Sequence, residues 1–264
     1  MRRFLNTATL CSLMLSGVAA STAAMAAPAA TAASPQVQTI RTLQHLETIS
    51  YKAGTAFYLY SVLNRDPQEY KKMQAQISAG DGVVQKLGNN AISPKWNDFK
   101  HSLTAAKFTT EGVADNTSIN AIDGALSSLT QTIRTSETEQ KLAGKVSTDK
   151  MADMLYEQYV LMEVMTAAYL RKSADYFGGS IVASQGPEVE IDLLADKFSQ
   201  QLLQLNRYYA KTPQVAQSLK EITTKWTFIK NSFKNFNKDN VPFIVGRYNE
   251  QITEKLLAAH ESLM

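Results

Sequence analysis

The sequence predicts an all-α protein built from two tandem up-and-down four-helix bundles. Apolar residues recur at spacings of three and four along most of the chain, and helix start and stop signals divide them into eight segments. Short motifs also recur in the same order in the two halves of the chain. Alternation of apolar and polar residues over more than four positions is absent, so no strand is expected.

Four helices are expected in the first half of the chain. Asp66 suits the N-cap of the second helix and Pro67 its first position, while Gly88 ends that helix. Ser93-Pro94 opens the third helix in the same way. The expected helices run from Val37 to Leu63, from Pro67 to about Leu87, from Ser93 through Leu103 and from Asp115 through Ile133.

Four more helices are expected in the second half. They run from about Thr148 to near Gly178, from Gly186 through Leu205, from Thr212 through Phe236 and from Asn240 through Leu263. The third of these has the clearest apolar stripe, with alternating steps of four and three: Val215, Leu219, Ile222, Trp226, Ile229, Phe233 and Phe236. Such a helix needs partner helices to bury its stripe.

Three markers recur in the same order and indicate an internal duplication. Residues 55–59 and 166–170 share the pattern T-A-x-Y-L. Asp66-Pro67 then corresponds to Gly186-Pro187. Residues 96–103 and 226–233 share the pattern W-x-x-[F/I]-K-x-S-[L/F]. The second bundle is therefore expected to be a copy of the first.

The first 26 residues read as a secretory signal peptide. Arg2 and Arg3 precede an apolar run that ends at Leu15, and small residues then lead to Ala24-Met25-Ala26, an A-x-A cleavage site, with residues 18–20 as a second choice. The run is too short and too rich in Ser and Thr for a good membrane span. We therefore expect a periplasmic protein with no stable membrane span after cleavage.

The whole chain is then expected to divide into five segments. They are a signal peptide at 1–26, a flexible leader at 27–36, a first four-helix unit at 37–135, a polar connection at 136–148 and a second four-helix unit at 149–264. The polar connection is either a linker or a solvated helix that joins the two bundles continuously.

Several classes of function are disfavoured by composition. Cys11 is the only cysteine and lies in the signal peptide, so the mature chain has no thiolate for a metal, a haem or a nucleophile. His45, His101 and His260 lack the spacing of a zinc site. No phosphate-binding loop or nucleophile elbow is present. We expect no enzyme activity and no cofactor.

The charge balance argues against nucleic acid as a partner. The formal net charge of +3 falls to about +1 once Arg2 and Arg3 are removed, whereas nucleic-acid binding needs a concentrated basic surface.

Residues 156–164, followed by Ala168-Tyr169-Leu170, resemble the ligand helix of a known sensor family. The family is the periplasmic N-terminal domain of type IV pilus methyl-accepting chemotaxis transducers, to which a domain of nitrate/nitrite sensor kinases is related. Gln158 and Leu161 match its pattern. The resemblance implies four-helix bundles and a sensor-like role, with two copies in this chain.

The signature arginines of that family are absent at the matching positions. Those positions hold Glu157, Tyr159 and Val164 in the second copy, and Leu46, Thr48 and Ala53 in the first. A guanidinium binds a planar oxyanion through two parallel hydrogen bonds, and these side chains cannot. We therefore expect the fold to carry over without the nitrate-type site built from those arginines.

The candidate ligand-binding residues lie where the resemblance places the ligand helix. They are Gln158, Tyr159, Met162 and Tyr169, together with Trp226. These side chains are expected either to line a small-molecule pocket between helices or to be ordinary core packing.

A metal site is the alternative on the same helix. Met151, Met154, Met162 and Met165 form two M-x-x-M pairs whose soft thioethers suit Cu(I). Their spacing also continues the apolar stripe, so core packing is the other interpretation.

The sequence thus favours a non-enzymatic, sensor-like helical module that binds a small ligand or a partner protein. A membrane sensor or another envelope protein is the expected partner, because no signalling module follows the helices in this sequence. The alternatives are copper handling through the methionine pairs and a purely structural role in the cell envelope.

Overall fold

The computed structural model describes residues 34–145, 150–177, 190–236 and 240–263, and the predicted signal peptide lies outside them. Within these ranges the chain is all-α, and its only β-type pairing is an isolated bridge between Phe108 and Ala114. The predicted fold class is confirmed. The helices are α1 (Pro35–Val62), α2 (Pro67–Leu87), α3 (Ile92–Thr104), α4 (Asn116–Gly144), α5 (Lys150–Phe177), α6 (Ile191–Tyr208), α7 (Pro213–Lys234) and α8 (Pro242–Glu261), with a short 3₁₀ turn at Tyr209–Lys211.

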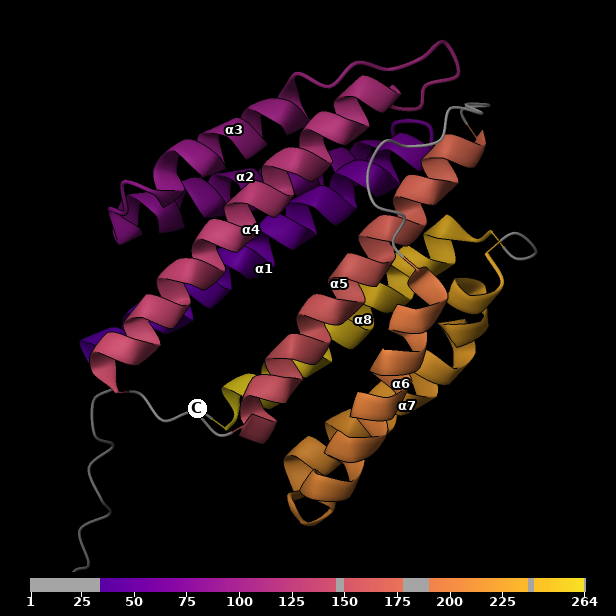
Figure 1. Cartoon of the computed structure of the whole chain (residues 1–264). Helices are drawn as coiled ribbons and strands as arrows, with labels where there is room; N and C mark the ends of the chain where they lie inside the picture. The colour runs from indigo at the N-terminus through magenta and orange to yellow at the C-terminus, as the bar shows by residue number, and fades with distance from the viewer. Residues whose placement is uncertain (1–33, 146–149, 178–189, 237–239, 264) are drawn as a thin grey trace, which may run out of the picture. The chain divides into compact units, whose positions relative to one another are not determined.

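The helices pack as two sets of four (Figure 1). In the first set α1 packs against α2 and α4, and α3 packs against the same two helices. In the second set α5 packs against α6 and α8, and α7 against the same two helices. Helix α1 also packs against α5 and α8, so that residues 34–264 form one compact unit.

The start of α2 follows the expected local chemistry. The Asp66 carboxylate accepts from the backbone N–H groups of Gln68 and Glu69, and Pro67 occupies the first turn of α2. Helix α4 continues to Gly144 and ends where Lys145 is left-handed, so this part of the polar connection is helical and α4 and α5 are separate helices. The expected start of the sixth helix at Gly186-Pro187 lies outside the described residues.

The two tryptophans occupy equivalent places in the two bundles. Each lies buried on the third helix of its set and donates a hydrogen bond from Nε1 to a side chain of the second helix. Trp96 donates to Oδ1 of Asp81 over 2.7 Å, and Trp226 donates to Oγ of Ser199 over 3.0 Å. This shared arrangement supports the internal duplication.

The residue before each of these acceptors differs in size between the copies. In the second bundle Phe198 lies against Trp226, with the ring centroids 4.5 Å apart. In the first bundle that position is Gly80, and a Cβ there would lie 2.2 Å from two ring atoms of Trp96. The absence of a side chain at Gly80 is therefore what lets α2 approach the indole of α3.

Among the described residues, no helix combines the length and the apolar character that a membrane crossing requires.

The close approach at Gly80 predicts the effect of a single methyl group. Gly80→Ala should lower the free energy of unfolding by about 1–3 kcal/mol, since the completely buried Trp96 ring has no room to move. Gly82→Ala is the matched control, because it lies in the same helix and its Cβ meets nothing within 4 Å. That change should raise stability by roughly 0.5–1 kcal/mol. Urea unfolding followed by tryptophan fluorescence measures both, and equal effects would contradict the packing argument.

Candidate functional site

The polar side chains of the protein interior gather where α1 meets α5. We call this junction the polar seam; its members are Gln44, Glu47, Thr48 and Thr55 on α1, Tyr156, Tyr159 and Glu163 on α5, and Asn249 on α8. Helix α1 packs against α2, α4, α5 and α8, so it keeps little solvent-facing surface. Two glutamates, Glu47 and Glu163, are in consequence each only 1% exposed.

Glu47 is held by partners from two other helices. Its Oε1 accepts from Nε of Arg134 on α4 over 2.7 Å, and its Oε2 accepts from the Tyr156 hydroxyl on α5 over 2.7 Å. Nη2 of Arg134 also lies 3.4 Å from the Tyr51 hydroxyl. Burial raises the pKa of Glu47, and the charge of Arg134 and these hydrogen bonds oppose that rise. Burial and the charge of Glu47 raise the pKa of Tyr51 to about 12.

A groove lies between α4 and α5, and Glu47 is part of its lining. It consists of two hollows of about 970 and 570 Å³ that share Tyr51, Arg134, Thr138 and Val164. We call it the α4–α5 groove. Its α4 wall carries small polar residues such as Ser127 and Thr130, while the α5 wall includes Val160, Leu161, Val164, Ala167 and Ala168.

A second arginine, Arg171, lines the larger of the two hollows. Arg171 of α5 forms an ion pair with Asp123 of α4 over 2.9 Å, and its Nη2 donates to Oδ1 of Asn120 over 3.0 Å. These contacts link the two walls of the groove.

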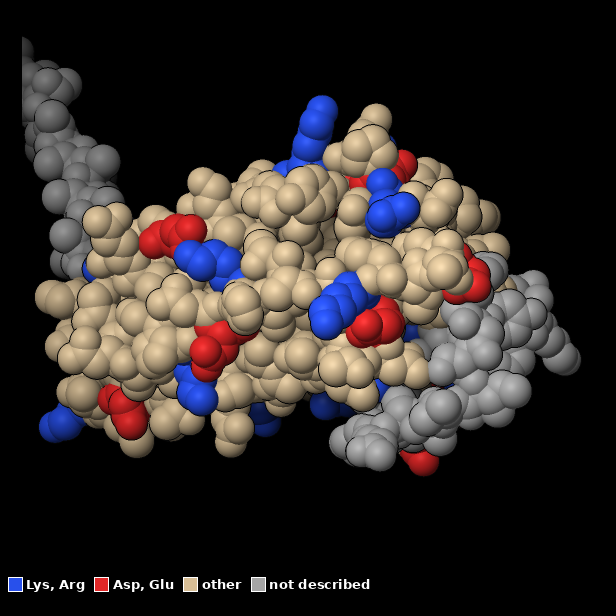
Figure 2. Space-filling model, turned by 90° about the horizontal axis from the view of Figure 1, so that it is seen from above, with Lys and Arg blue, Asp and Glu red and all other residues tan. Residues whose placement is uncertain are grey.

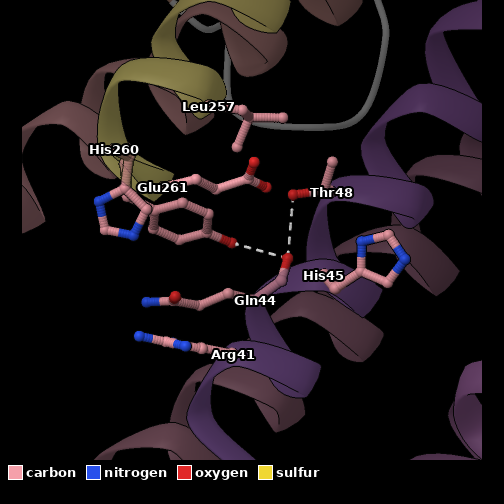
Figure 3. Close-up of a pocket in the computed structure, with 8 residues that line it drawn as sticks. Arg41, Gln44, His45, Thr48, Leu257, His260 and Glu261 are labelled. Atoms are coloured by element: carbon pink, nitrogen blue, oxygen red, sulfur yellow. Dashed lines mark hydrogen bonds between the residues drawn. The ribbon is translucent and has the colours of Figure 1, made fainter. Parts of the chain in front are cut away.

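A third hollow, of about 300 Å³, adjoins the groove through Gln44 and Tyr156. Its lining residues are Arg41, Gln44, His45, Thr48, Tyr156, Leu257, His260 and Glu261 (Figure 3). Figure 3 shows the side chains of Arg41 and Gln44 side by side, with their nitrogens directed to the same side. Nδ1 of the buried His260 lies 2.9 Å from the Ala152 carbonyl and so donates to it, while its Nε2 has no hydrogen-bond partner within the described ranges.

The fourth hollow lies between α2 and α8 and has Glu163 in its lining. We call it the α2–α8 hollow; its volume is about 220 Å³. Oε2 of Glu163 accepts from the Thr55 hydroxyl over 3.0 Å and from Nδ2 of Asn249 over 3.1 Å. Burial raises the pKa of Glu163, and these hydrogen bonds oppose the rise.

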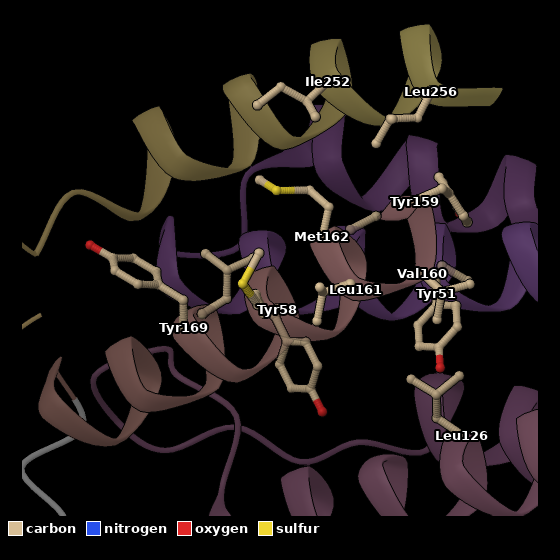
Figure 4. Packing of buried hydrophobic residues seen from close by; sticks show 14 of the residues in the cluster. Tyr51, Tyr58, Leu126, Tyr159, Val160, Leu161, Met162, Tyr169, Ile252 and Leu256 are labelled. Atoms are coloured by element: carbon tan, nitrogen blue, oxygen red, sulfur yellow. The ribbon is translucent and has the colours of Figure 1, made fainter. Parts of the chain in front are cut away.

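The candidate residues from the sequence are all buried, and none of them lines the four hollows above. They are Gln158, Tyr159, Met162, Tyr169 and Trp226. The Tyr159 hydroxyl donates to the Thr48 carbonyl in the polar seam over 3.1 Å. Nε2 of Gln158 donates to the Phe198 carbonyl over 2.8 Å, and the Tyr169 hydroxyl accepts from the Val241 N–H over 2.8 Å. Figure 4 shows Met162 directed from α5 toward Ile252 of α8.

The methionine pairs follow the same pattern. Met151, Met162 and Met165 are buried and Met154 is partly buried, each packed in or against the hydrophobic core. In the described part of the chain, no group of three or more His, Cys, Asp or Glu side chains is placed to hold a metal ion. Copper handling stays a prediction.

Sequence reasoning missed the charged members of the seam. A single apolar stripe was assigned to α1 and to α5, although both helices are buried on several sides. The available signal was the shortage of polar surface around Glu47 and Glu163, whose neighbours are mostly Thr, Ser, Ala, Val, Met and Leu. A charged residue inside a helix without a wide polar face must lie buried and paired.

The charges on the face shown in Figure 2 do not indicate a further binding site. On the face shown in Figure 2, the described basic and acidic side chains are interspersed, and no large area of one sign forms.

The Glu47–Arg134 pair predicts a measurable loss of stability. Arg134→Met should lower the free energy of unfolding by about 1–3 kcal/mol, because the buried carboxylate loses its charged partner while the half-exposed arginine itself is partly screened by water. Adding Glu47→Gln should recover much of that loss. Arg247→Met is the control, since the Arg247–Glu250 pair is exposed and should change stability by less than about 0.5 kcal/mol. A double variant as unstable as Arg134→Met alone would contradict the pairing.

The raised pKa of Glu163 predicts how the substitution Glu163→Gln changes stability with pH. Its folded-state pKa is raised, so the stability that it contributes is present below its ordinary pKa of 4.5 and is lost as pH rises through the folded-state value. Relative to the wild type, Glu163→Gln should therefore gain stability as pH rises above 4.5 and through the folded-state pKa of Glu163. Glu221→Gln should show the opposite trend, because a hydrogen bond from Lys255 lowers the pKa of Glu221. Urea unfolding across pH measures both, and a pH-independent difference for Glu163→Gln would refute the assignment.

Comparison of the chain with protein-family models, with curated proteins and with solved structures found no match. The resemblance to sensor domains therefore stays a prediction, and function is inferred from the geometry of the polar seam and its hollows.

Proposed function

We propose that the protein is a non-catalytic helical binding module of the periplasm that takes up a small ligand bearing a carboxylate or another oxyanion in the larger hollow of the α4–α5 groove, whose charged lining residues are Arg134 and Arg171 against Asp123. The proposed location rests on the signal-peptide pattern in residues 1–26. The proposed ligand chemistry rests on one observation, the placement of Arg134 between the two hollows of the groove.

Arg134 has hydrogen-bonding capacity left over for a ligand. A guanidinium carries about five N–H donors in a planar fork. Nε of Arg134 is used by Glu47 and Nη2 approaches Tyr51, while the side chain lines both hollows and is 51% exposed to solvent. The remaining donors suit the two oxygens of a carboxylate.

The groove also fixes Arg134 before any ligand arrives. The contacts to Glu47 and Tyr51 hold the guanidinium plane, so that little side-chain freedom is lost on binding. Thr130 and Thr138 line the groove beside it, with their hydroxyls donating to the carbonyls of Ser127 and Arg134, and the small side chain of Ala167 leaves room on the opposite wall. We infer binding without catalysis because the Glu47 carboxylate is buried and already holds Arg134 and Tyr156, so it is poorly placed as a base.

Such a ligand would touch both bundles at once. Arg134 belongs to α4 and the facing residues belong to α5, so an occupant would favour one spacing of these two helices. An envelope protein in contact with both bundles is the kind of partner that can detect this difference.

The proposal predicts binding of small anions by the chain from residue 27 onward. A panel of acetate, succinate, citrate, nitrate and phosphate is tested by thermal unfolding and by calorimetry. At least one member should stabilise the protein, by about 2.7 kcal/mol when present at roughly one hundred times its Kd. Arg134→Met should weaken that binding at least about tenfold, which corresponds to about 1.4 kcal/mol.

Arg247→Met is the matched control, since it removes an arginine that lies outside the groove. Each variant is compared with its own ligand-free state, because Arg134→Met is expected to be less stable. A wild-type protein that responds to no member of the panel would contradict the proposal, and so would an Arg134→Met variant that binds as tightly as the wild type.

A further inference from the structure

The α2–α8 hollow is formed by different residues from the α4–α5 groove, and its charge balance is opposite to that of the larger hollow of the groove. Its charged lining residues are Glu69, Glu163, Glu250 and Glu254 against Lys52 and Lys72. Carboxylates therefore outnumber basic side chains in the lining. This balance disfavours a second anion and favours a cation.

The deepest carboxylate of the hollow is positioned by a close helix approach. A Cβ at Gly246 would lie 2.7 Å from the terminal methyl groups of Leu59, so the glycine lets α8 pack near to α1 without displacing that side chain. One turn further along α8, Asn249 meets Glu163, and its Nδ2 donates to Oε2 of Glu163 over 3.1 Å. Thr55 donates to the same oxygen from α1. Three helices thus fix the Glu163 carboxylate.

Two buried acceptors in the lining lack a donor among the described residues. Asn249 is 3% exposed, and its Oδ1 accepts no hydrogen bond from the described part of the chain. Glu69 is also buried, and its Oε2 has no partner there, although Lys72 donates to its Oε1 over 3.0 Å. A buried acceptor without a donor costs about 1–3 kcal/mol, so the hollow gains stability from a ligand that donates hydrogen bonds.

The basic residues of the hollow do not supply these donors. Lys72 is engaged by Glu69 and lies 3.4 Å from Glu250. In the described part of the chain, Lys52 makes no hydrogen bond to Glu163 and acts on it only through its charge.

The size and chemistry of the hollow limit which class of cation can bind there. Ca²⁺ requires about six to eight oxygen ligands, and no group of three or more His, Cys, Asp or Glu in the described residues is placed around a common point. A primary ammonium needs fewer acceptors, since it has three N–H donors on one charged centre. Ala56, Leu59 and Ala75 provide apolar surface for a short alkyl chain, and about 220 Å³ limits the ligand to a few heavy atoms.

We propose that the α2–α8 hollow binds a small primary alkylammonium ion, which donates to the Glu163 carboxylate and to Oδ1 of Asn249.

The test uses n-butylammonium as the probe and the chain from residue 27 onward. Calorimetry and thermal unfolding should show saturable binding with one ligand per chain. Two matched probes separate the contributions: n-butanol has the alkyl chain without the charge, and tetramethylammonium has the charge without N–H donors. Both should bind at least about tenfold more weakly than n-butylammonium.

Glu163→Gln removes the charge and keeps the shape of the side chain, so it should abolish n-butylammonium binding. Its fold is expected to persist, because the glutamine side-chain oxygen can still accept from Thr55 and Asn249. Glu221→Gln is the control, since it removes a glutamate that does not line the hollow. Equal binding to Glu163→Gln and the wild type, equal binding of tetramethylammonium, or no binding of n-butylammonium by the wild type would each overturn the proposal.

This test is independent of the anion panel. Arg134→Met should leave n-butylammonium binding unchanged, because Arg134 does not line the α2–α8 hollow. Failure of one proposal therefore leaves the other intact.

Discussion

The burial of Glu47 and Glu163 between α1 and α5 is the constraint on which the rest of the structure depends. A carboxylate that is removed from water must be paired, hydrogen-bonded or protonated, because burial without such compensation costs several kcal/mol. Glu47 takes its partners from α4 and α5, and Glu163 takes its partners from α1 and α8. The two glutamates thereby tie helices of both bundles to one junction, and the four hollows lie around it.

The internal repeat accounts for the framework and not for the junction. Tyr58 on α1 and Tyr169 on α5 come from the same repeated motif, and both are completely buried. The Tyr58 hydroxyl donates to Asp123 of α4, whereas the Tyr169 hydroxyl accepts from the backbone N–H of Val241 beside α8. Equivalent helices thus provide equivalent packing, while their polar side chains meet different partners. The two copies of that motif lie 111 residues apart. At this spacing Glu47 corresponds to Gln158 and Glu163 corresponds to Lys52, so neither glutamate has an acidic counterpart in the other copy.

The apolar stripes predicted the helices well, because each stripe is buried against a neighbour in the same bundle. The stripe from Val215 to Phe236 is entirely buried, and Phe236 stays buried although α7 ends at Lys234. The polar seam was not predictable in the same way, because a periodic pattern shows which face of a helix is apolar and not how many helices surround it. Glu47 and Arg134 lie 87 residues apart in the sequence and meet because α1 packs against α4. The sequence around Glu47 therefore does not reveal that Arg134 is its partner.

The two sides of the seam differ in the hydrogen-bonding capacity that remains after folding. Glu47 is matched by an arginine with donors to spare, so the α4–α5 groove has an excess of donors around Arg134. Glu163 is matched by a hydroxyl and an amide, each a neutral group, and the amide oxygen of Asn249 is left without a donor. The stacked rings of Tyr156 and Tyr159, with centroids 5.9 Å apart, lie between the two glutamates, and each phenol donates within the seam. One buried junction therefore presents spare donors at Arg134 on one side and spare acceptors on the other, and the two binding proposals rest on this difference.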